Sequence, residues 1–255
     1  MLNSTVIGLI PARAGSKRLP GKNVRVFAGH PLIAYTVSAA LDSGIFSRVV
    51  VSTDSVEVAD LCRFYGAEVP FLRPVEYAGD QSPDIEWIDY TLRRLARQGE
   101  TCDAFSILRP TSPFRRPDTI RRAWEQFLGV AGADSLRAVE LSKQHPGKMW
   151  VLEGKFMRSL LDDGGANPPW HSSAYQALPP VYAQNASLEI AWTRVPLETG
   201  TIAGKNIVPF LTEGVEGFDI NRQDDFWLAE SLLAHGQAKL PEVRRSPRGE
   251  ASGTA

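Results

Sequence analysis

The residues best suited to chemistry form a basic segment from Pro11 to Asn23, which reads PARAGSKRLPGKN. It holds four basic residues, two glycines, two prolines and no acidic residue. Glycines let backbone N–H groups approach phosphates, and Lys and Arg side chains neutralise the phosphate charge. Because a nucleoside triphosphate is strongly anionic, this composition predicts a triphosphate-binding loop. A solvated basic turn is the structural alternative.

This loop does not match the two commonest phosphate-binding patterns. Five residues separate Gly15 from Gly21, whereas a Walker loop has four. Asn23 stands where that loop needs Ser or Thr to hold magnesium. A Rossmann GxGxxG is also absent from the sequence. The segment therefore predicts a phosphate loop of another type.

The elements around the loop alternate between strand and helix. Strand–helix–strand spacing of this kind favours right-handed βαβ units and a mostly parallel sheet between two helical layers, a three-layer α/β/α fold of Rossmann-like type. Val- and Ile-rich strands without polar alternation fit a sheet that is covered on both faces. Strands are expected at 5–10, 48–52, 68–72, 103–108, 137–141, 187–192 and 205–209, and helices at 30–43, 55–65, 84–98, 117–128 and 223–234.

Ligands of such sheets bind beyond the carboxyl ends of the strands. The segments after Ile10, Ser52 and Leu108 are therefore the expected site, and they are the most unusual segments of the chain. Asp54 follows the second strand directly. It is expected either to cap the next helix or to lie near the nucleotide.

The alternation lapses over 142–182, a stretch rich in Pro, Gly, Trp and His that is interpreted as an inserted arm. One domain is expected over 1–235, with the arm inside it. The polar, charged and small residues within 236–255 predict a disordered tail.

Composition narrows the class of protein. The 255 residues carry a formal net charge of -1, which argues against a nucleic-acid partner. No apolar run is long enough for a membrane span, and the N-terminus lacks the basic start of a leader, so a cytoplasmic location is expected. Hydrophobic residues make up 43%, enough for a sizeable core. Cys62 and Cys102 fit buried small hydrophobes better than a disulfide or a zinc site.

The sequence LIPARAGSKRLPGKN at 9–23 resembles the signature of the acylneuraminate cytidylyltransferases, the CMP-sialic acid synthetases. The similarity continues through 29–41, 49–60, 73–83, 108–120 and 217–230, where the chain reads GFDINRQDDFWLAE. It covers about residues 5–232 and is weakest in the arm. The resemblance implies the nucleotide-diphospho-sugar transferase type of fold and an arm that forms a homodimer.

The resemblance also assigns roles to individual residues. The first loop would wrap the triphosphate, the segment after the third strand would touch the sugar, and the segment before the last helix would hold a metal. Nucleotide-binding positions are Ala12, Arg13, Ala14, Gly15, Ser16, Lys17, Lys22, Asn23, Arg73 and Asp80. Sugar-binding positions are Arg109, Thr111, Ser112 and Asn185, metal-binding positions are Asp219 and Asn221, and Arg13, Lys22 and Asp219 are the catalytic candidates.

Three departures from the family pattern fall in this set. Arg109 replaces a common glutamine, and a guanidinium can still serve a sugar carboxylate. Ala186 and Glu189 replace a glycine and an aromatic residue. Asn221 replaces a common Asp, which leaves a neutral oxygen ligand on the same side of the strand as Asp219.

The expected activity is therefore transfer of CMP from CTP to an acidic 2-keto-3-deoxy sugar, an N-acylneuraminate or a related nonulosonic acid, with release of pyrophosphate. Mg²⁺ is the implied cofactor, and Mn²⁺ is a possible substitute. Legionaminic, pseudaminic or Kdo acid as acceptor, GTP as donor, and an inactive nucleotide-sugar-binding protein are the open alternatives. The general base, the acyl groups of the sugar and the glycan that it supplies stay unassigned.

Overall fold

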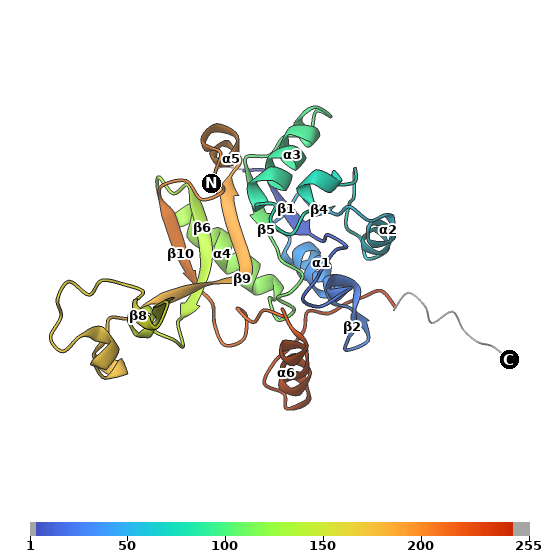
Figure 1. Cartoon of the computed structure of the whole chain (residues 1–255). Coiled ribbons are helices and arrows are strands. Elements are labelled where there is room, and N and C mark those ends of the chain that lie inside the picture. Colours follow the sequence, from blue (N-terminus) through green and yellow to red (C-terminus); the bar gives the residue numbers. More distant parts are fainter. Residues whose placement is uncertain (1–3, 247–255) are drawn as a thin grey trace. The chain divides into compact units, whose positions relative to one another are not determined.

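The computed structural model describes residues 4–246, and its centre is a six-stranded sheet with strand order β10-β6-β9-β5-β1-β4 (Figure 1). β1 pairs in parallel with both β4 and β5, whereas β9 runs antiparallel to β5. The sheet is thus mostly parallel around β1, as the sequence predicts. Its strands are β1 (Val6–Pro11), β4 (Arg48–Ser52), β5 (Ala104–Ile107), β6 (Ser135–Leu141), β9 (Tyr182–Trp192) and β10 (Ile207–Leu211).

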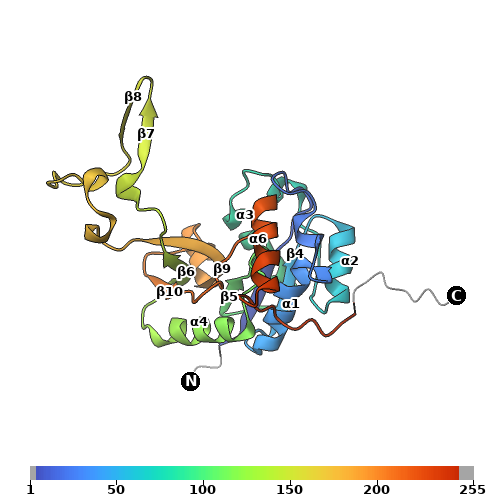
Figure 2. The same cartoon turned by 90° about the horizontal axis from the view of Figure 1, so that it is seen from below.

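Helices cover the sheet on both faces because alternate residues of each strand point to opposite sides. Ile7 and Leu9 of β1 pack in a cluster with Trp87 of α3, whereas Val6 and Ile10 pack in a cluster with residues of α1, α2 and α4. Figure 2 shows α3 on one side of the strands and α1 and α4 on the other. The three-layer architecture is confirmed. The helices are α1 (Leu32–Ser43), α2 (Val56–Phe64), α3 (Asp84–Ala96), α4 (Pro117–Gly129), α5 (Arg194–Thr199) and α6 (Gln223–Ala234).

Two element predictions need correction. No strand forms over 68–72, where Glu68 makes only an isolated bridge to Val50. Pro70 lacks a backbone N–H, so it cannot continue the ladder. The first helix begins at Leu32 rather than at residue 30, because His30–Pro31 is the short strand β3, paired with β2 (Val26–Phe27).

A third core cluster fastens the loop segments to α6. Phe27 lies edge-on to Phe226 with ring centroids 5.3 Å apart, and Leu19 from the basic loop is buried in the same cluster. Ala238 is also buried there, and Leu240 packs against it, so this part of the expected tail is packed on the core. Residues 247–255 of that tail lie outside the described residues.

Val139–Gln184 forms a compact unit separate from the rest of the chain. Within it, β7 (Trp150–Glu153) and β8 (Phe156–Ser159) make an antiparallel hairpin. His145 is buried, and its ring lies edge-on to Trp170 at 5.8 Å. The hairpin itself leaves Phe156 82% exposed, so this unit carries apolar surface without a partner inside it. None of the helices over 4–246 has the length and apolarity to span a membrane.

Candidate active site

The basic loop starts where β1 ends and is tied to the end of β4. The Ala12 amide donates to the Ser52 carbonyl at 2.9 Å, and Ala12 is fully buried. The Ala14 amide donates to Asp54 Oδ1 at 2.8 Å. Ser55, not Asp54, caps α2 by accepting from the Val58 amide. Asp54 therefore belongs to the loop, and the capping interpretation of this residue is wrong.

Asp80 holds two of the loop cations. Its carboxylate oxygens lie 2.7 Å from Arg13 Nη1 and 2.5 Å from Lys17 Nζ. The hydrogen bond from Lys17 and then that from Arg13 lower the pKa of the Asp80 carboxyl. Gly15 and Ser16 lie between these cations, and a Cβ on Gly15 would meet open space. The loop thus presents cations and accessible backbone, held by a carboxylate of its own.

Lys22 connects the loop to the segment before α6. Its Nζ donates to Asn221 Oδ1 at 3.3 Å, and Asn23 Nδ2 donates to the Arg13 carbonyl at 3.5 Å. Burial lowers the pKa of the Lys22 ammonium, and the nearby Asp219 charge opposes this effect. The structure therefore brings Lys22, Asp219 and Asn221 together, although they are far apart in sequence.

The donor set around Asp219 fits a divalent cation. Asp219 Oδ2 accepts a hydrogen bond from Asn221 Nδ2, whereas Oδ1 is buried without a hydrogen-bond partner. A buried carboxylate oxygen without a donor is costly unless a cation or water meets it. Among residues 4–246 no group of three or more His, Cys, Asp or Glu residues is placed to hold a metal. Magnesium commonly takes one or two carboxylates and completes its shell with phosphates and water, so the unpartnered Asp219 oxygen is compatible with such an ion, whereas the Asn221 oxygen already accepts from Lys22.

Arg73 fastens the end of β4 from inside the protein. Its side chain donates to the Ser52 hydroxyl at 3.0 Å and the Ser52 carbonyl at 2.8 Å, and it lies over the Trp87 ring. Burial lowers the pKa of its guanidinium to about 10, and the charges of Asp54 and Asp84 oppose that shift. Arg73 is 5% exposed, so its structural effect is to support the strand from which Asp54 emerges.

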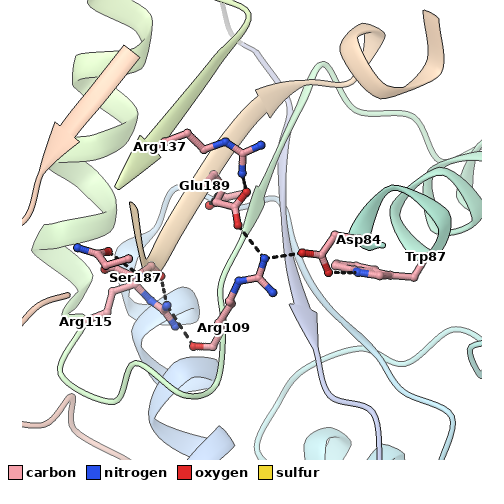
Figure 3. Close-up of polar contacts among 9 residues, drawn as sticks. Asp84, Trp87, Arg109, Arg115, Arg137, Ser187 and Glu189 are labelled. Atoms are coloured by element: carbon pink, nitrogen blue, oxygen red, sulfur yellow. Dashed lines mark hydrogen bonds and ion pairs between the residues drawn. The ribbon is translucent and has the colours of Figure 1, made fainter. Parts of the chain in front are cut away.

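A charge network lies beyond the end of β5 (Figure 3). Arg109 Nη2 donates to Asp84 Oδ2 at 2.5 Å and to Glu189 Oε1 at 2.8 Å. Arg137 of β6 pairs with the other oxygen of Glu189. Burial by itself would raise the pKa of the Asp84 carboxyl, but the charge and hydrogen bond of Arg109 lower it overall. The network therefore keeps two acidic and two basic side chains together beyond the end of β5.

The turn after Arg109 joins this network to the proposed metal site. The Ile220 amide donates to the Thr111 carbonyl at 2.8 Å, so the segment containing Asp219 lies beside the turn. Ser112 is buried, and its hydroxyl lacks a hydrogen-bond partner. Arg115, also buried, donates to the carbonyls of Arg109 and Ser187, and burial lowers the pKa of its guanidinium to about 9.

Asn185 makes no described hydrogen bond to Arg109, Thr111 or Ser112. Its amide nitrogen donates to Thr212 Oγ1 at 2.9 Å, and its oxygen accepts from the Ser187 amide at 3.1 Å. It precedes Glu189 by four residues on β9, a separation of about 13 Å along a strand. The structure thus places both Asn185 and Glu189 inside β9, but well separated from each other along the strand.

Sequence reasoning missed three members of the site. Asp84 was expected only as the start of a helix, although it opens α3 at the edge where ligands bind. Arg137 was assigned to a strand without a role, yet a charge inside an apolar strand was an available signal. Arg115 carried no such signal because it sits in a run of basic residues and prolines.

Comparison with known proteins identifies the family of this chain. A family model described as cytidylyltransferase matches residues 7–98. CMP-N,N'-diacetyllegionaminic acid synthase of Legionella pneumophila is 36% identical over 242 residues, which are 92% of this chain and 99% of that protein. N-acylneuraminate cytidylyltransferase of Escherichia coli is 30% identical over 231 residues, but this chain spans only 52% of its length.

Solved structures show the same fold at low sequence identity. CMP:2-keto-3-deoxy-manno-octonic acid synthetase complexed with CTP aligns with a TM-score of 0.66 and 14% identity, over 91% of this chain and 100% of that one. That likeness supports the architecture alone. The full-length similarity to the Legionella protein, together with the loop and the segment before α6, shows that this chain belongs to the acylneuraminate cytidylyltransferase family.

Proposed function

We propose that this chain transfers CMP from CTP to an acidic 2-keto-3-deoxy sugar, an N-acylneuraminate or a related nonulosonic acid, and releases pyrophosphate. The observation that carries the proposal is the junction of the basic loop with Asp219, made through Lys22 and Asn221. That junction places cations and an unpartnered carboxylate oxygen at one edge of the sheet, as transfer from a triphosphate requires.

In this proposal the loop binds the triphosphate. Arg13, Lys17 and Lys22 neutralise the phosphates, and the pyrophosphate charge that develops as it leaves is stabilised by the same cations. The backbone N–H groups of Arg13 and Gly15 and the Asn23 amide supply further donors, whereas the amides of Ala12, Ala14 and Ser16 already donate within the protein. Arg73 and Asp80 support this nucleotide site through Ser52 and through the loop cations, respectively.

The reaction is a displacement at phosphorus. The anomeric hydroxyl oxygen of the acid forms a new bond to the α-phosphorus, and the bond from that phosphorus to the bridging oxygen breaks. Pyrophosphate leaves with the electron pair, and the hydroxyl proton passes to solvent. A Mg²⁺ or Mn²⁺ ion held by Asp219 and Asn221 would supply positive charge at the phosphates. Arg13, Lys22 and Asp219 are the catalytic residues.

The acceptor lies on the side of the turn after β5. We assign Arg109, Thr111, Ser112 and Asn185 to this side, with Thr111 nearest the Asp219 segment through its carbonyl. The relatives' names include legionaminic acid and N-acylneuraminate as acids that those proteins activate. A panel with these two acids, pseudaminic acid and Kdo therefore covers the acceptor class.

We also propose that the chain is one nucleotidyltransferase domain over 1–235, and that the arm at 142–182 joins two copies in a homodimer. The exposed apolar side chains of its hairpin, Leu152, Phe156 and Met157, support this role. A location in the cytoplasm, where CTP is made, completes the proposal.

The test is pyrophosphate release with four triphosphates and four acids in the presence of Mg²⁺. We expect CTP to exceed ATP, GTP and UTP at least tenfold in kcat/KM, which is about 1.4 kcal/mol of discrimination. Faster turnover with GTP would overturn the choice of base. Absence of release with every pair would overturn the activity.

A further inference from the structure

Arg109 has no complete edge left for a substrate carboxylate. A guanidinium can bind a carboxylate through two parallel hydrogen bonds along either of two forked edges, and both edges include Nη2. In this protein Nη2 donates to Asp84 Oδ2 and to Glu189 Oε1 (Figure 3). Its two hydrogens are therefore both engaged by protein carboxylates.

The charges around Arg109 also argue against binding of a substrate carboxylate by this residue. Asp84 and Glu189 bring two carboxylates to one guanidinium, and Arg137 pairs with the second oxygen of Glu189. The four side chains form a neutral set. A carboxylate arriving at Arg109 would find the guanidinium charge already compensated by two fixed carboxylates, so it would gain little attraction there.

The two carboxylates differ in what they can still do. The Glu189 side chain is 5% exposed, and each of its oxygens faces an arginine, so it serves as a tie between β9, Arg109 and Arg137. The Asp84 side chain is 29% exposed. Its oxygens accept one bond each, from Trp87 Nε1 at 2.7 Å and from Arg109, so each retains capacity for another donor.

We infer that Asp84 recognises the acceptor by accepting a hydrogen bond from a hydroxyl or N–H group of the acceptor. Arg109 and Glu189 are positioning residues that fix the orientation of the Asp84 side chain. The acceptor's own carboxylate is bound outside this four-residue network. The inference rests on the proposed function, because it presupposes an acceptor on this side of the sheet. Asp84 then recognises a neutral, hydrogen-donating part of that acceptor.

The experiment compares two related probes on three proteins. The probes are the acid that gives the fastest pyrophosphate release with the wild-type chain and the methyl ester of that acid, and the proteins are wild type, Arg109→Gln and Asp84→Asn. If no acid supports release by the wild type, the proposed function fails before any variant is made. If release is found, the inference is tested on its own.

Dissociation constants of the acid and the ester, measured calorimetrically with CTP present, give a preference for the free acid. We expect Arg109→Gln to weaken both probes by a similar factor and to leave this preference within about twofold. Loss of the preference by tenfold or more in this variant would show that Arg109 binds the carboxylate, and the inference would be wrong.

Steady-state kinetics separate Asp84 from a general structural role. We expect Asp84→Asn to raise the KM for the acid tenfold or more while the KM for CTP changes by less than threefold. Arg109→Lys should restore part of what Arg109→Gln loses, because an ammonium can still face both carboxylates. An unchanged KM for the acid in Asp84→Asn would contradict the assignment. Arg194→Gln, which removes an exposed arginine paired with Asp134, is the matched control.

Discussion

Asp219 is expected to matter for activity while contributing little to the stability of the free protein. Its Oδ1 atom is buried without a donor, and such an unsatisfied acceptor costs about 1–3 kcal/mol. Asp219→Asn removes the charge and keeps the size. The unfolding free energy should therefore stay within about 1 kcal/mol of wild type or rise, because an amide oxygen is less costly to leave unpartnered than a carboxylate.

The catalytic rate of Asp219→Asn should fall, although its stability is nearly unchanged. Metal stabilisation of transition-state charge is worth several kcal/mol, and each 1.36 kcal/mol corresponds to a factor of ten in rate. A loss of about 3 kcal/mol predicts a fall in kcat of roughly 10²-fold. CTP binding should weaken much less, because Arg13, Lys17 and Lys22 are untouched.

Asp225→Asn is the matched control for this substitution. Asp225 Oδ2 accepts from the amides of Asn221 and Arg222, both at 2.8 Å, so it caps α6. Asn keeps an oxygen that can accept the same bonds, so the substitution should cost no more than the value of about 1 kcal/mol for losing a cap, and Tm should fall by no more than roughly 2–4 °C in a chain of this size. Calorimetric unfolding measures stability, CTP titration measures nucleotide binding, and kinetics across a Mg²⁺ series measure kcat and its metal dependence. Near-normal kcat with the same Mg²⁺ dependence in Asp219→Asn would refute the reasoning.

Three further predictions concern the loop, acid stability and the arm. Asp80→Asn should tighten pyrophosphate binding, measured by calorimetry, about threefold to tenfold, because it frees two loop cations. The control Asp60→Asn changes the net charge equally and should leave pyrophosphate binding unchanged. Equal effects of the two variants would disprove the role of Asp80 in holding the loop cations. Arg109 lowers the pKa of the Asp84 carboxyl below its ordinary value of 3.8. The carboxylate therefore stabilises the folded protein above pH 3.8, and this stability is lost as the pH falls through the lower pKa of the folded state. Wild type should therefore lose its stability advantage over Asp84→Asn in acid denaturation below pH 3.8, and parallel curves would contradict this. Light scattering should give about twice the 28.0 kDa chain mass, and replacing Leu152 and Phe156 by Asp should halve it; a fully active wild-type monomer would defeat the arm's role.

The elements that the sequence predicted well have strong local signals. The Val- and Ile-rich runs of β1 and β4 and the bounds of α6 follow from residue type and flanking turns. β9 begins at Tyr182, earlier than predicted, because its first residues are exposed or half-buried and lack the run of buried apolar residues that marks the rest of the strand. α5 was missed because Pro196 lies within a six-residue helix, where propensity alone disfavours it.

The residues of the candidate site likewise include some that the sequence indicates and some that it does not. The basic loop was visible because its chemistry is concentrated in one segment. The Asp84–Arg109–Glu189 contacts were not, because they join residues 25 and 80 positions apart, and only the packing of α3 and β9 against β5 brings them together. The pairing of Arg13 and Lys17 with Asp80 was likewise hidden, since Asp80 lies more than sixty residues further along the chain.

The central claim is that the α-phosphorus of CTP becomes bonded to the acceptor acid. Phosphorus-31 NMR of this chain with CTP, Mg²⁺ and the panel of acids observes this directly. Our account predicts one new phosphodiester resonance, appearing at the same rate as pyrophosphate and slowed roughly 10²-fold in Asp219→Asn. Pyrophosphate or phosphate formed without that resonance would mean hydrolysis rather than transfer and would contradict the account.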